Sequence, residues 1–144
     1  MEYKLIELTN KNDVLEAYDI YKHCMYMPTE STFHKKIDGF FNDSSVKIFA
    51  CYSKDKLEGI IVVSFVKRWE IEILGIAVDI SVRNKGVGSY MINQLVNDYN
   101  LHSIYAETDI DAVGFYCKNG FAISEFKKTY NGDTYIRYLC TFSK

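Results

Sequence analysis

The sequence predicts an α/β domain of the mixed (α+β) kind, built on a sheet of about seven strands, and three observations carry that prediction. Seven segments are apolar or alternate between polar and apolar residues, as strands do. Four segments with apolar residues at helical spacing interrupt them, giving the order β-α-α-β-β-β-α-β-α-β-β. The three successive strands favour antiparallel pairing, whereas the strand-helix-strand unit that follows implies one parallel pair.

The first third of the chain predicts one short strand and two helices. Tyr3–Leu8 alternates between polar and apolar residues, as a half-buried strand does. A helix is expected next, with Asn10 or Asn12 as its cap. A second helix is expected over Thr32–Phe41. The apolar positions that mark the two helices are Val14, Ala17, Tyr18, Tyr21, Phe33, Ile37, Phe40 and Phe41.

The middle of the chain predicts a meander of three strands joined by short polar turns. The expected strands are Val46–Ser53, Leu57–Val66 and Trp69–Val78. The second of them, LEGIIVVSFV, is the most continuously apolar, which is typical of a strand buried on both faces. We therefore expect Leu57–Val66 to lie near the centre of the sheet.

The last part of the chain alternates helices with strands and ends in a hairpin. Asn119-Gly120 is a good helix terminator, because both residue types accept left-handed backbone angles. Asn131-Gly132 between two strand-like segments is a strong hairpin signal. The expected elements are a helix from Val87 to near Asn100, a strand over His102–Ala106, a short helix over Ala112–Lys118, and hairpin strands over Phe121–Tyr130 and Thr134–Phe142.

Composition narrows the function classes. With 144 residues, 48% hydrophobic and 25% charged, residues 1–144 fit one globular domain. A net charge of -2 gives no basic surplus for nucleic acid, so no nucleic-acid partner is expected. The four cysteines are scattered, without a CxxC pair or a nearby histidine at ligand spacing, so neither a metal site nor a disulfide is expected. The N-terminus lacks a signal-like apolar segment and no stretch is long enough to span a membrane, so we expect a cytoplasmic protein without a membrane partner.

A basic, glycine-containing turn joins the third meander strand to the next helix. Its sequence, RNKGVGS, covers Arg83–Ser89. Amide groups at a helix N-terminus lack intrahelical partners and lie at the positive end of the helix dipole, so they bind phosphate well. Gly86 and Gly88 would let the backbone approach a ligand, while Arg83 and Lys85 add positive charge. The same pattern also fits an ordinary strand-to-helix turn with basic surface residues.

Two common phosphate motifs do not fit this turn. GxxxxGK[ST] is absent from the chain. A dinucleotide fingerprint would require a third glycine where this chain has the bulky Met91.

Two segments instead resemble motifs of the GNAT family of N-acetyltransferases. Ile76-Ala77-Val78, followed by Arg83–Gly88, resembles the family's apolar strand end and its R/Q-x-x-G-x-G/A turn. Ala112–Phe121 resembles its A-x-x-x-Y-x-x-x-G-F motif, and the two come in the family's order. The resemblance implies the GNAT fold, a mixed and mostly antiparallel sheet with helices on both faces. It also implies that strands 69–78 and 102–106 are parallel and splayed apart by a bulge.

The resemblance implies acetyl-CoA as co-substrate, and from the residue pattern no metal is expected beside it. The pyrophosphate of CoA would be bound at the basic turn, and the pantetheine arm would pair with the preceding strand end like an added strand. An N–H group of Ile76 or Val78 would then polarise the thioester carbonyl. The cofactor-binding residues implied are Ile76, Ala77, Val78, Arg83, Asn84, Lys85, Gly86, Val87, Gly88 and Ser89.

The resemblance also implies catalytic residues. Tyr116 matches the family's usual general acid, which protonates the departing thiolate; the alternative is one more packed aromatic among 12 tyrosines. Glu72 stands where some members carry a general base. On a regular strand it would share a face with Leu74, Ile76 and Val78 and point into the cleft. An exposed glutamate on the sheet is the alternative, and Glu70, Glu107 or a water relay are rivals for the base.

The acceptor is expected to be a primary amine, on a small molecule or a peptide, that takes the acetyl group directly in a ternary complex. The resemblance places its site between Tyr18–Phe41 and Tyr130–Tyr135, where aromatic and acidic residues would attract a cation. Two other readings stay open: a regulatory module that binds acyl-CoA without turnover, and an acetyltransferase that modifies protein N-termini or lysines. The resemblance leaves a homodimer open as well.

Overall fold

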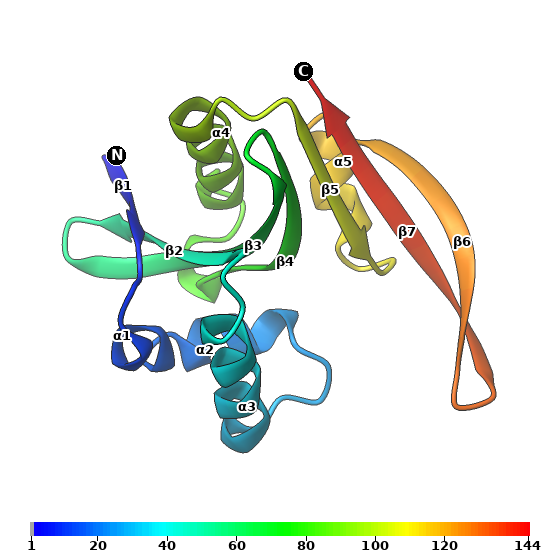
Figure 1. The fold of residues 1–144 in the computed structure, drawn as a ribbon, viewed down its shortest axis with the longest axis horizontal. Helices are drawn as coiled ribbons and strands as arrows, with labels where there is room; N and C mark the ends of the chain where they lie inside the picture. Colours follow the sequence, from blue (N-terminus) through cyan, green and yellow to red (C-terminus); the bar gives the residue numbers. More distant parts are fainter. Residues whose placement is uncertain (1) are drawn as a thin grey trace.

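The computed structural model describes residues 2–144 and is built on one seven-stranded sheet. The strand order is β1-β2-β3-β4-β5-β7-β6, with β4 and β5 parallel and the other neighbours antiparallel (Figure 1). The predicted mixed, mostly antiparallel sheet is therefore confirmed. The strands are β1 (Tyr3–Glu7), β2 (Val46–Ser53), β3 (Lys56–Lys67), β4 (Glu70–Val78), β5 (Ser103–Thr108), β6 (Ala122–Tyr130) and β7 (Asp133–Ser143).

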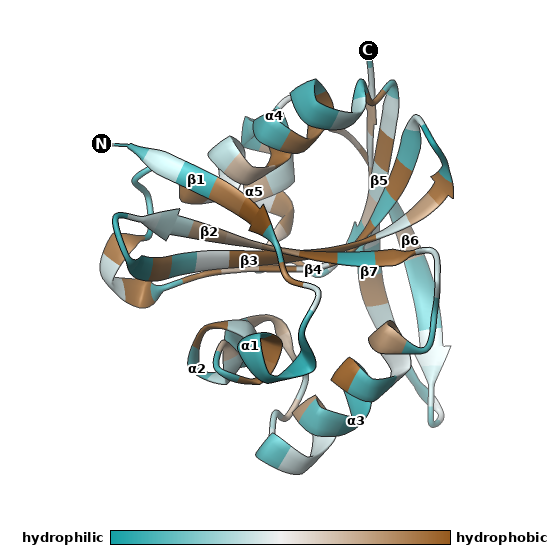
Figure 2. Cartoon of the chain, turned by 60° about the vertical axis from the view of Figure 1, so that its left-hand side comes forward, coloured by the Kyte–Doolittle hydropathy of each residue, from teal (hydrophilic) through white to brown (hydrophobic). Residues whose placement is uncertain are grey.

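Helices cover both faces of the sheet, as expected. In Figure 2 the helices α4 and α5 lie on one side of the sheet, and α1, α2 and α3 lie on the other. The helices are α1 (Lys11–Leu15), α2 (Tyr18–Tyr21), α3 (Glu30–Phe41), α4 (Val87–Tyr99) and α5 (Val113–Lys118), with short 3-10 turns η1 (Lys22–Cys24) and η2 (Ile80–Val82).

The sheet separates two hydrophobic cores, and β3 contributes to both. Ile61 and Val63 pack toward α4, whereas Ile60 and Val62 pack toward α1, α2 and α3. All four side chains are fully buried. Because β3 is covered on both faces, it reads as a continuous apolar run rather than an alternating one. The prediction that this strand is central is thus confirmed.

The first predicted helix is in fact two short helices. The backbone at Ala17, with φ -89° and ψ 9°, interrupts the helix between α1 and α2. Val14, Ala17 and Tyr21 nevertheless stay buried on one side, so the periodic pattern survives the break. Asn10 caps α1 as predicted, by accepting a hydrogen bond from the Asn12 amide at 2.8 Å.

A bulge in β4 separates it from β5. Register with β3 shifts between Val62 and Val63, whose partners are Gly75 and Ile73, so that Leu74 has no partner. The ladder between β4 and β5 covers only Glu70–Glu72, although both strands continue beyond it. The predicted splay of the parallel pair is therefore present, and it opens at the bulge.

A glutamate in β3 is buried without a complete set of partners. Glu58 is 4% exposed, and its Oε2 has no hydrogen-bond partner among residues 2–144. Burial first, and then this carboxylate, raise the pKa of the nearby Cys51 thiol to about 11. A buried carboxylate that lacks partners opposes folding, because its desolvation is not offset.

Replacing this carboxylate with an unbranched apolar side chain should stabilise the protein. We expect Glu58→Met to raise the free energy of unfolding by about 1–2 kcal/mol and Tm by roughly 2–8 °C. Thermal denaturation followed by circular dichroism measures the shift, with Glu125→Met on exposed β6 as the control. A lower Tm for Glu58→Met would mean that the carboxylate has a stabilising partner.

Candidate functional site

The N-terminus of α4 is open to a ligand. Gly86 takes the N-cap position at φ 87°, a left-handed conformation that favours glycine, and no side chain caps this helix. By contrast, Asn10 caps α1 and Thr29 caps α3. A Cβ added to Gly86 would have nothing within 4 Å. The first amides of α4 therefore lack a side-chain acceptor, and the space in front of them is free.

The basic residues of the turn are available to an anion. Arg83 and Lys85 are exposed, and neither forms an ion pair with any residue in 2–144. Asn84, between them, has φ 64° and completes the turn with Gly86. Positive side chains and free helix amides thus lie in one short segment, which is the combination that binds phosphate groups.

The structure gives Gly88 a packing role, which differs from the role in ligand approach that the sequence suggested. The interpretation was that Gly88 lets a ligand approach the backbone, but it is buried in the first turn of α4. A Cβ there would lie 2.7 Å from Cε1 of Phe115 in α5. Gly88 therefore lets α4 pack closely against α5, and the approach to the helix end is left to Gly86.

The end of β4 presents an unpaired backbone edge next to α4. Ile76, Ala77 and Val78 pair with β3 on one side, and within residues 2–144 no strand pairs with their other side. Ala77 is buried against the α1–α3 core, while Ile76 and Val78 pack toward α4. The three residues are thus held in extended form with a free edge facing the splay.

Tyr116 is buried on the α5 side of the sheet. It is 4% exposed and packs edge-on against Phe121, with ring centroids 5.2 Å apart. Burial, followed by the Cys140 and Cys24 thiols, raises the pKa of Tyr116 well above its ordinary value. The phenol is consequently protonated throughout the physiological range. In the free protein it is also a weaker acid than an ordinary tyrosine.

Glu72 does not face the direction that a regular strand would give it. The bulge at Leu74 reverses the alternation, so Glu72 lies on the face of Gly75 and Ala77 rather than that of Ile76 and Val78. The expected shared face was therefore wrong, because an inserted residue shifts the two-residue period by one. Glu72 lies on the α1–α3 side.

The hydroxyl of Tyr105, the β5 partner of Glu72 in the parallel ladder, donates a hydrogen bond to Glu72 Oε1 at 3.5 Å. Burial and then the charges of Glu72 and Glu70 raise the pKa of this phenol. A protonated Tyr105 therefore serves as a donor that helps to hold the Glu72 carboxylate in place.

The Glu107 carboxylate forms ion pairs with two cationic side chains. Its Oε2 lies 3.0 Å from Arg137 Nε and 3.2 Å from Lys128 Nζ. Burial pushes the pKa of Glu107 upward, but the hydrogen bonds from Lys128 and Arg137 outweigh it and keep the pKa below its ordinary value. A carboxylate in this state is a poor proton acceptor, which weakens Glu107 as a rival to Glu72.

Two residues of the first helical region, Tyr21 and Cys24, lie against the β4 bulge. The helical pattern marked Tyr21 only as an apolar position, and no local pattern singled out Cys24. Tyr21 is 1% exposed, and its hydroxyl packs against Gly75. The Cys24 thiol donates to the Tyr21 carbonyl at 3.2 Å. Although the Cys24 residue as a whole is exposed, burial of its thiol raises the pKa to about 11, and the Ile76 backbone opposes the shift.

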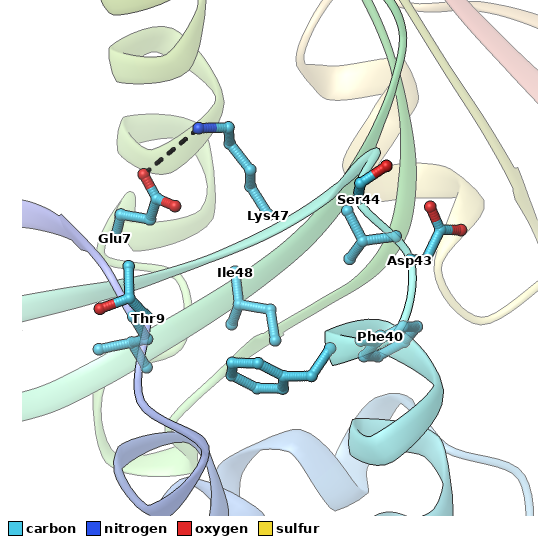
Figure 3. Close-up of a pocket in the computed structure, with 10 residues that line it drawn as sticks. Glu7, Thr9, Phe40, Asp43, Ser44, Lys47 and Ile48 are labelled. Atoms are coloured by element: carbon cyan, nitrogen blue, oxygen red, sulfur yellow. Dashed lines mark ion pairs between the residues drawn. The ribbon is translucent and has the colours of Figure 1, made fainter.

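Two hollows of the surface lie away from these residues. One, of about 240 Å³, lies between the start of β2 and the end of α3, where Phe40, Asp43 and Ile48 line it (Figure 3). The Glu7–Lys47 ion pair, at 3.5 Å, borders it. The other, of about 600 Å³, is lined by residues of the β3–β4 turn and the end of α4. Neither contains a residue of the candidate site.

Comparison with known families supplies the identity of the domain. The model of the acetyltransferase (GNAT) family matches residues 14–121, which include the basic turn, the β4 edge and Tyr116. The chain belongs to the GNAT acetyltransferase family. A search of curated protein sequences gives no match. The family assignment thus rests on the family model together with the fold.

Solved structures share the GNAT fold over nearly the whole chain at low sequence identity. A Vibrio cholerae spermidine N-acetyltransferase variant is 15% identical, with a TM-score of 0.74 over 98% of this chain and 93% of its own. The Escherichia coli ribosomal-protein-S18-alanine N-acetyltransferase is 17% identical, with a TM-score of 0.72 over 99% and 94%. A GNAT acetyltransferase from Elizabethkingia anophelis with acetyl-CoA bound is 18% identical, with a TM-score of 0.71 over 99% and 98%.

Two further properties bear on the expectations from sequence. Within residues 2–144, no helix combines the length and the apolar character needed to cross a membrane. The same residues contain no group of three or more His, Cys, Asp or Glu side chains placed to hold a metal ion.

Proposed function

We propose that this GNAT protein is an acetyl-CoA-dependent N-acetyltransferase that transfers an acetyl group to a primary amine. The observation that carries the proposal is the uncapped N-terminus of α4 beside the unpaired edge of β4. Both features leave backbone groups free within a short distance of one another. An elongated ligand with phosphates at one end and amides along its length would satisfy both sets, and acyl-CoA is such a ligand.

The residues present fit this co-substrate. The amides of Val87, Gly88 and Ser89, with Arg83 and Lys85, would bind the pyrophosphate. The backbone of Ile76–Val78 would pair with the pantetheine arm, as a strand edge pairs with an added strand. Bound acetyl-CoA supplies the thioester that the amine attacks, so the chemistry would take place where β4 and β5 part.

Three groups of the chain would then have separate roles in the reaction. An N–H of Ile76 or Val78 would stabilise the negative charge that develops on the thioester oxygen, where one such donor is typically worth about 3 kcal/mol. Glu72, directly or through water, would take the proton of the attacking amine. Tyr116 would give its proton to the departing thiolate. Transfer would be direct, with both substrates bound together.

Two fold relatives suggest what the acceptor could be. The Vibrio cholerae protein is named for spermidine, and the Escherichia coli protein for an alanine of ribosomal protein S18. Small amines and peptide amines are therefore both represented on this fold. We propose a primary amine of either kind here, approaching from the α1–α3 side that Glu72 faces.

If Glu72 is the base, its removal should affect the chemical step. We expect Glu72→Gln to lower kcat/KM by roughly 10²-fold, the lower end of the usual contribution of a general base. Glu70→Gln, two residues earlier on the same face, should stay within about threefold of wild type. Steady-state kinetics over a range of pH measure both. No loss in Glu72→Gln would exclude Glu72 and favour a water relay that does not include it. Equal losses in the two variants would mean that the kinetics report the negative charge of this strand rather than one base.

The proposal as a whole is tested by calorimetric titration of the purified protein with acetyl-CoA, CoA, ATP and NAD. Selective binding of acetyl-CoA and CoA is expected. Release of the CoA thiol in the presence of amines then measures transfer. Absence of acetyl-CoA binding would mean that the basic turn only connects β4 to α4, and it would contradict the proposal. Binding without transfer to any amine, peptides included, would favour the regulatory-module alternative.

A further inference from the structure

The strands on the far side of the β4–β5 splay, β5, β7 and β6, carry polar side chains on the same face of the sheet as Glu72. Ile104 and Ala106 of β5 point into the α4 core, so Tyr105 and Glu107 point to the opposite face. Arg137 of β7 reaches Glu107 from the same face. In Figure 1 the tip of the β6–β7 hairpin lies to the right of α1, α2 and α3, at about the level of α3.

Two cations and one carboxylate lie together on this face, on the β5 side of the splay. Glu107 binds both Lys128 and Arg137, so two positive charges meet one carboxylate and a net charge of +1 remains. Arg137 uses only its Nε in this contact. Its two Nη groups have no partner in the described part of the chain, and its side chain is 29% exposed. A guanidinium held at one edge in this way presents its other N–H groups to an incoming anion.

The other border of the splay is acidic. Glu72 and Glu70 on β4 form no ion pair with residues in 2–144, and Tyr105 is the one hydroxyl found bonded to Glu72 there. Glu107 lies two residues beyond Tyr105, which is about 7 Å farther along β5. Glu72 lies opposite Tyr105, one strand spacing of about 4.8 Å away, so the Cα atoms of Glu72 and Glu107 are roughly 8 Å apart. Arg137 is two residues from Leu139, the β7 partner of Glu107, and its side chain reaches back to the Glu107 carboxylate. Negative charge on one side of the splay thus faces net positive charge on the other.

We propose that the amine acceptor carries an anionic group, a carboxylate or a phosphate, that Arg137 binds while the amine lies on the Glu72 side. This inference rests on the proposed function, and it names the substrate class of that same site. The strand spacings place the two ends of the acceptor roughly 5–10 Å apart. An α-amino acid, whose amine and carboxylate share a carbon atom, is too short to reach both.

Charge decides against the other acceptor classes. A diamine or polyamine would bring a second cation to Arg137 and Lys128, where like charges repel. A neutral amine would gain nothing from the guanidinium. An amine that ends in a carboxylate or phosphate complements the charge on both sides of the splay, with its amine near Glu72 and its anion near Arg137.

Matched acceptors test the inference on the whole 144-residue chain. The probes are 6-aminohexanoate, 5-aminopentyl phosphate and hexylamine, which differ mainly in the group at the far end. We expect KM to be at least about tenfold lower for an anionic probe than for hexylamine. Whichever anionic probe has the lower KM identifies carboxylate or phosphate as the natural group. Equal KM for all three probes would overturn the inference.

Variants assign that preference to the guanidinium. Arg137→Gln should raise KM for the preferred anionic probe roughly 10- to 100-fold, with kcat and the KM for hexylamine nearly unchanged. Arg137→Lys should recover part of the loss. Lys127→Gln, on the opposite face of β6 from Lys128, is the matched control and should have no effect. An Arg137→Gln protein with wild-type KM for the anionic probes would contradict the assignment.

A binding measurement separates this inference from the proposed function. The ¹⁵N resonance of Arg137 Nε is followed by NMR during titration with each probe, with CoA present. A shift produced by the anionic probes and absent with hexylamine supports the anion subsite even if no acetyl group is transferred. No shift with either anionic probe would refute it, even if hexylamine is acetylated.

Discussion

Gly86→Glu is expected to weaken acetyl-CoA binding by at least about 100-fold. Gly86 has φ 87°, and a side chain there is strained by roughly 1–3 kcal/mol. The added carboxylate would also stand in the open space before the α4 amides, where it would compete with and repel the pyrophosphate. The strain favours a rearranged turn in the free variant, and the repulsion opposes the bound state, so both lower the affinity.

Isothermal titration with acetyl-CoA measures this loss. Gly39→Glu is the matched control, because Gly39 lies in α3, away from the turn, and a Cβ there also has nothing within 4 Å. The control should bind acetyl-CoA like wild type, and circular dichroism should show both variants folded. Binding by Gly86→Glu within threefold of wild type would remove the α4 N-terminus from the proposed site.

The sequence predicted the features that depend on local patterns. The glycine turn, the Asn131-Gly132 hairpin and the continuous apolar run of β3 each follow from backbone angles or burial that a few neighbouring residues determine. Asn131 and Gly132 indeed take φ 51° and 84°. The parallel β4–β5 pair followed from one connection, because a strand, a helix and a strand in succession favour it.

The features that the sequence did not predict depend on single insertions or on distant partners. The resemblance implied a bulge but not its position, and Gly75, which follows Leu74 directly, does not by itself show which residue is inserted; the insertion of Leu74 moves Glu72 to the other face. Glu107 remained a rival base because its partners, Lys128 and Arg137, are 21 and 30 residues away in the chain. Cys24 likewise acquires its place beside Ile76 only when η1 packs on β4.

Tyr116→Phe should lower kcat by roughly 10²-fold and leave the Kd for acetyl-CoA nearly unchanged. A positioned general acid typically contributes about 10²–10⁴-fold, and phenylalanine removes the acidic proton while it keeps the ring that packs against Phe121. Tm should therefore change little. Tyr99→Phe, a partly buried tyrosine of α4 whose ring packs against Phe49 and Phe65, is the control.

The pH dependence distinguishes an acid from a packing residue. The acid acts only when protonated, and burial raises the pKa of Tyr116 above the ordinary value of 10. A fall of kcat caused by Tyr116 should therefore begin only above pH 10 in the wild type, and that fall should be absent in Tyr116→Phe. A variant with wild-type kcat would show that the thiolate leaves without this proton. A variant with a weakened Kd or a lowered Tm instead would show that Tyr116 serves mainly to hold α5 against the sheet.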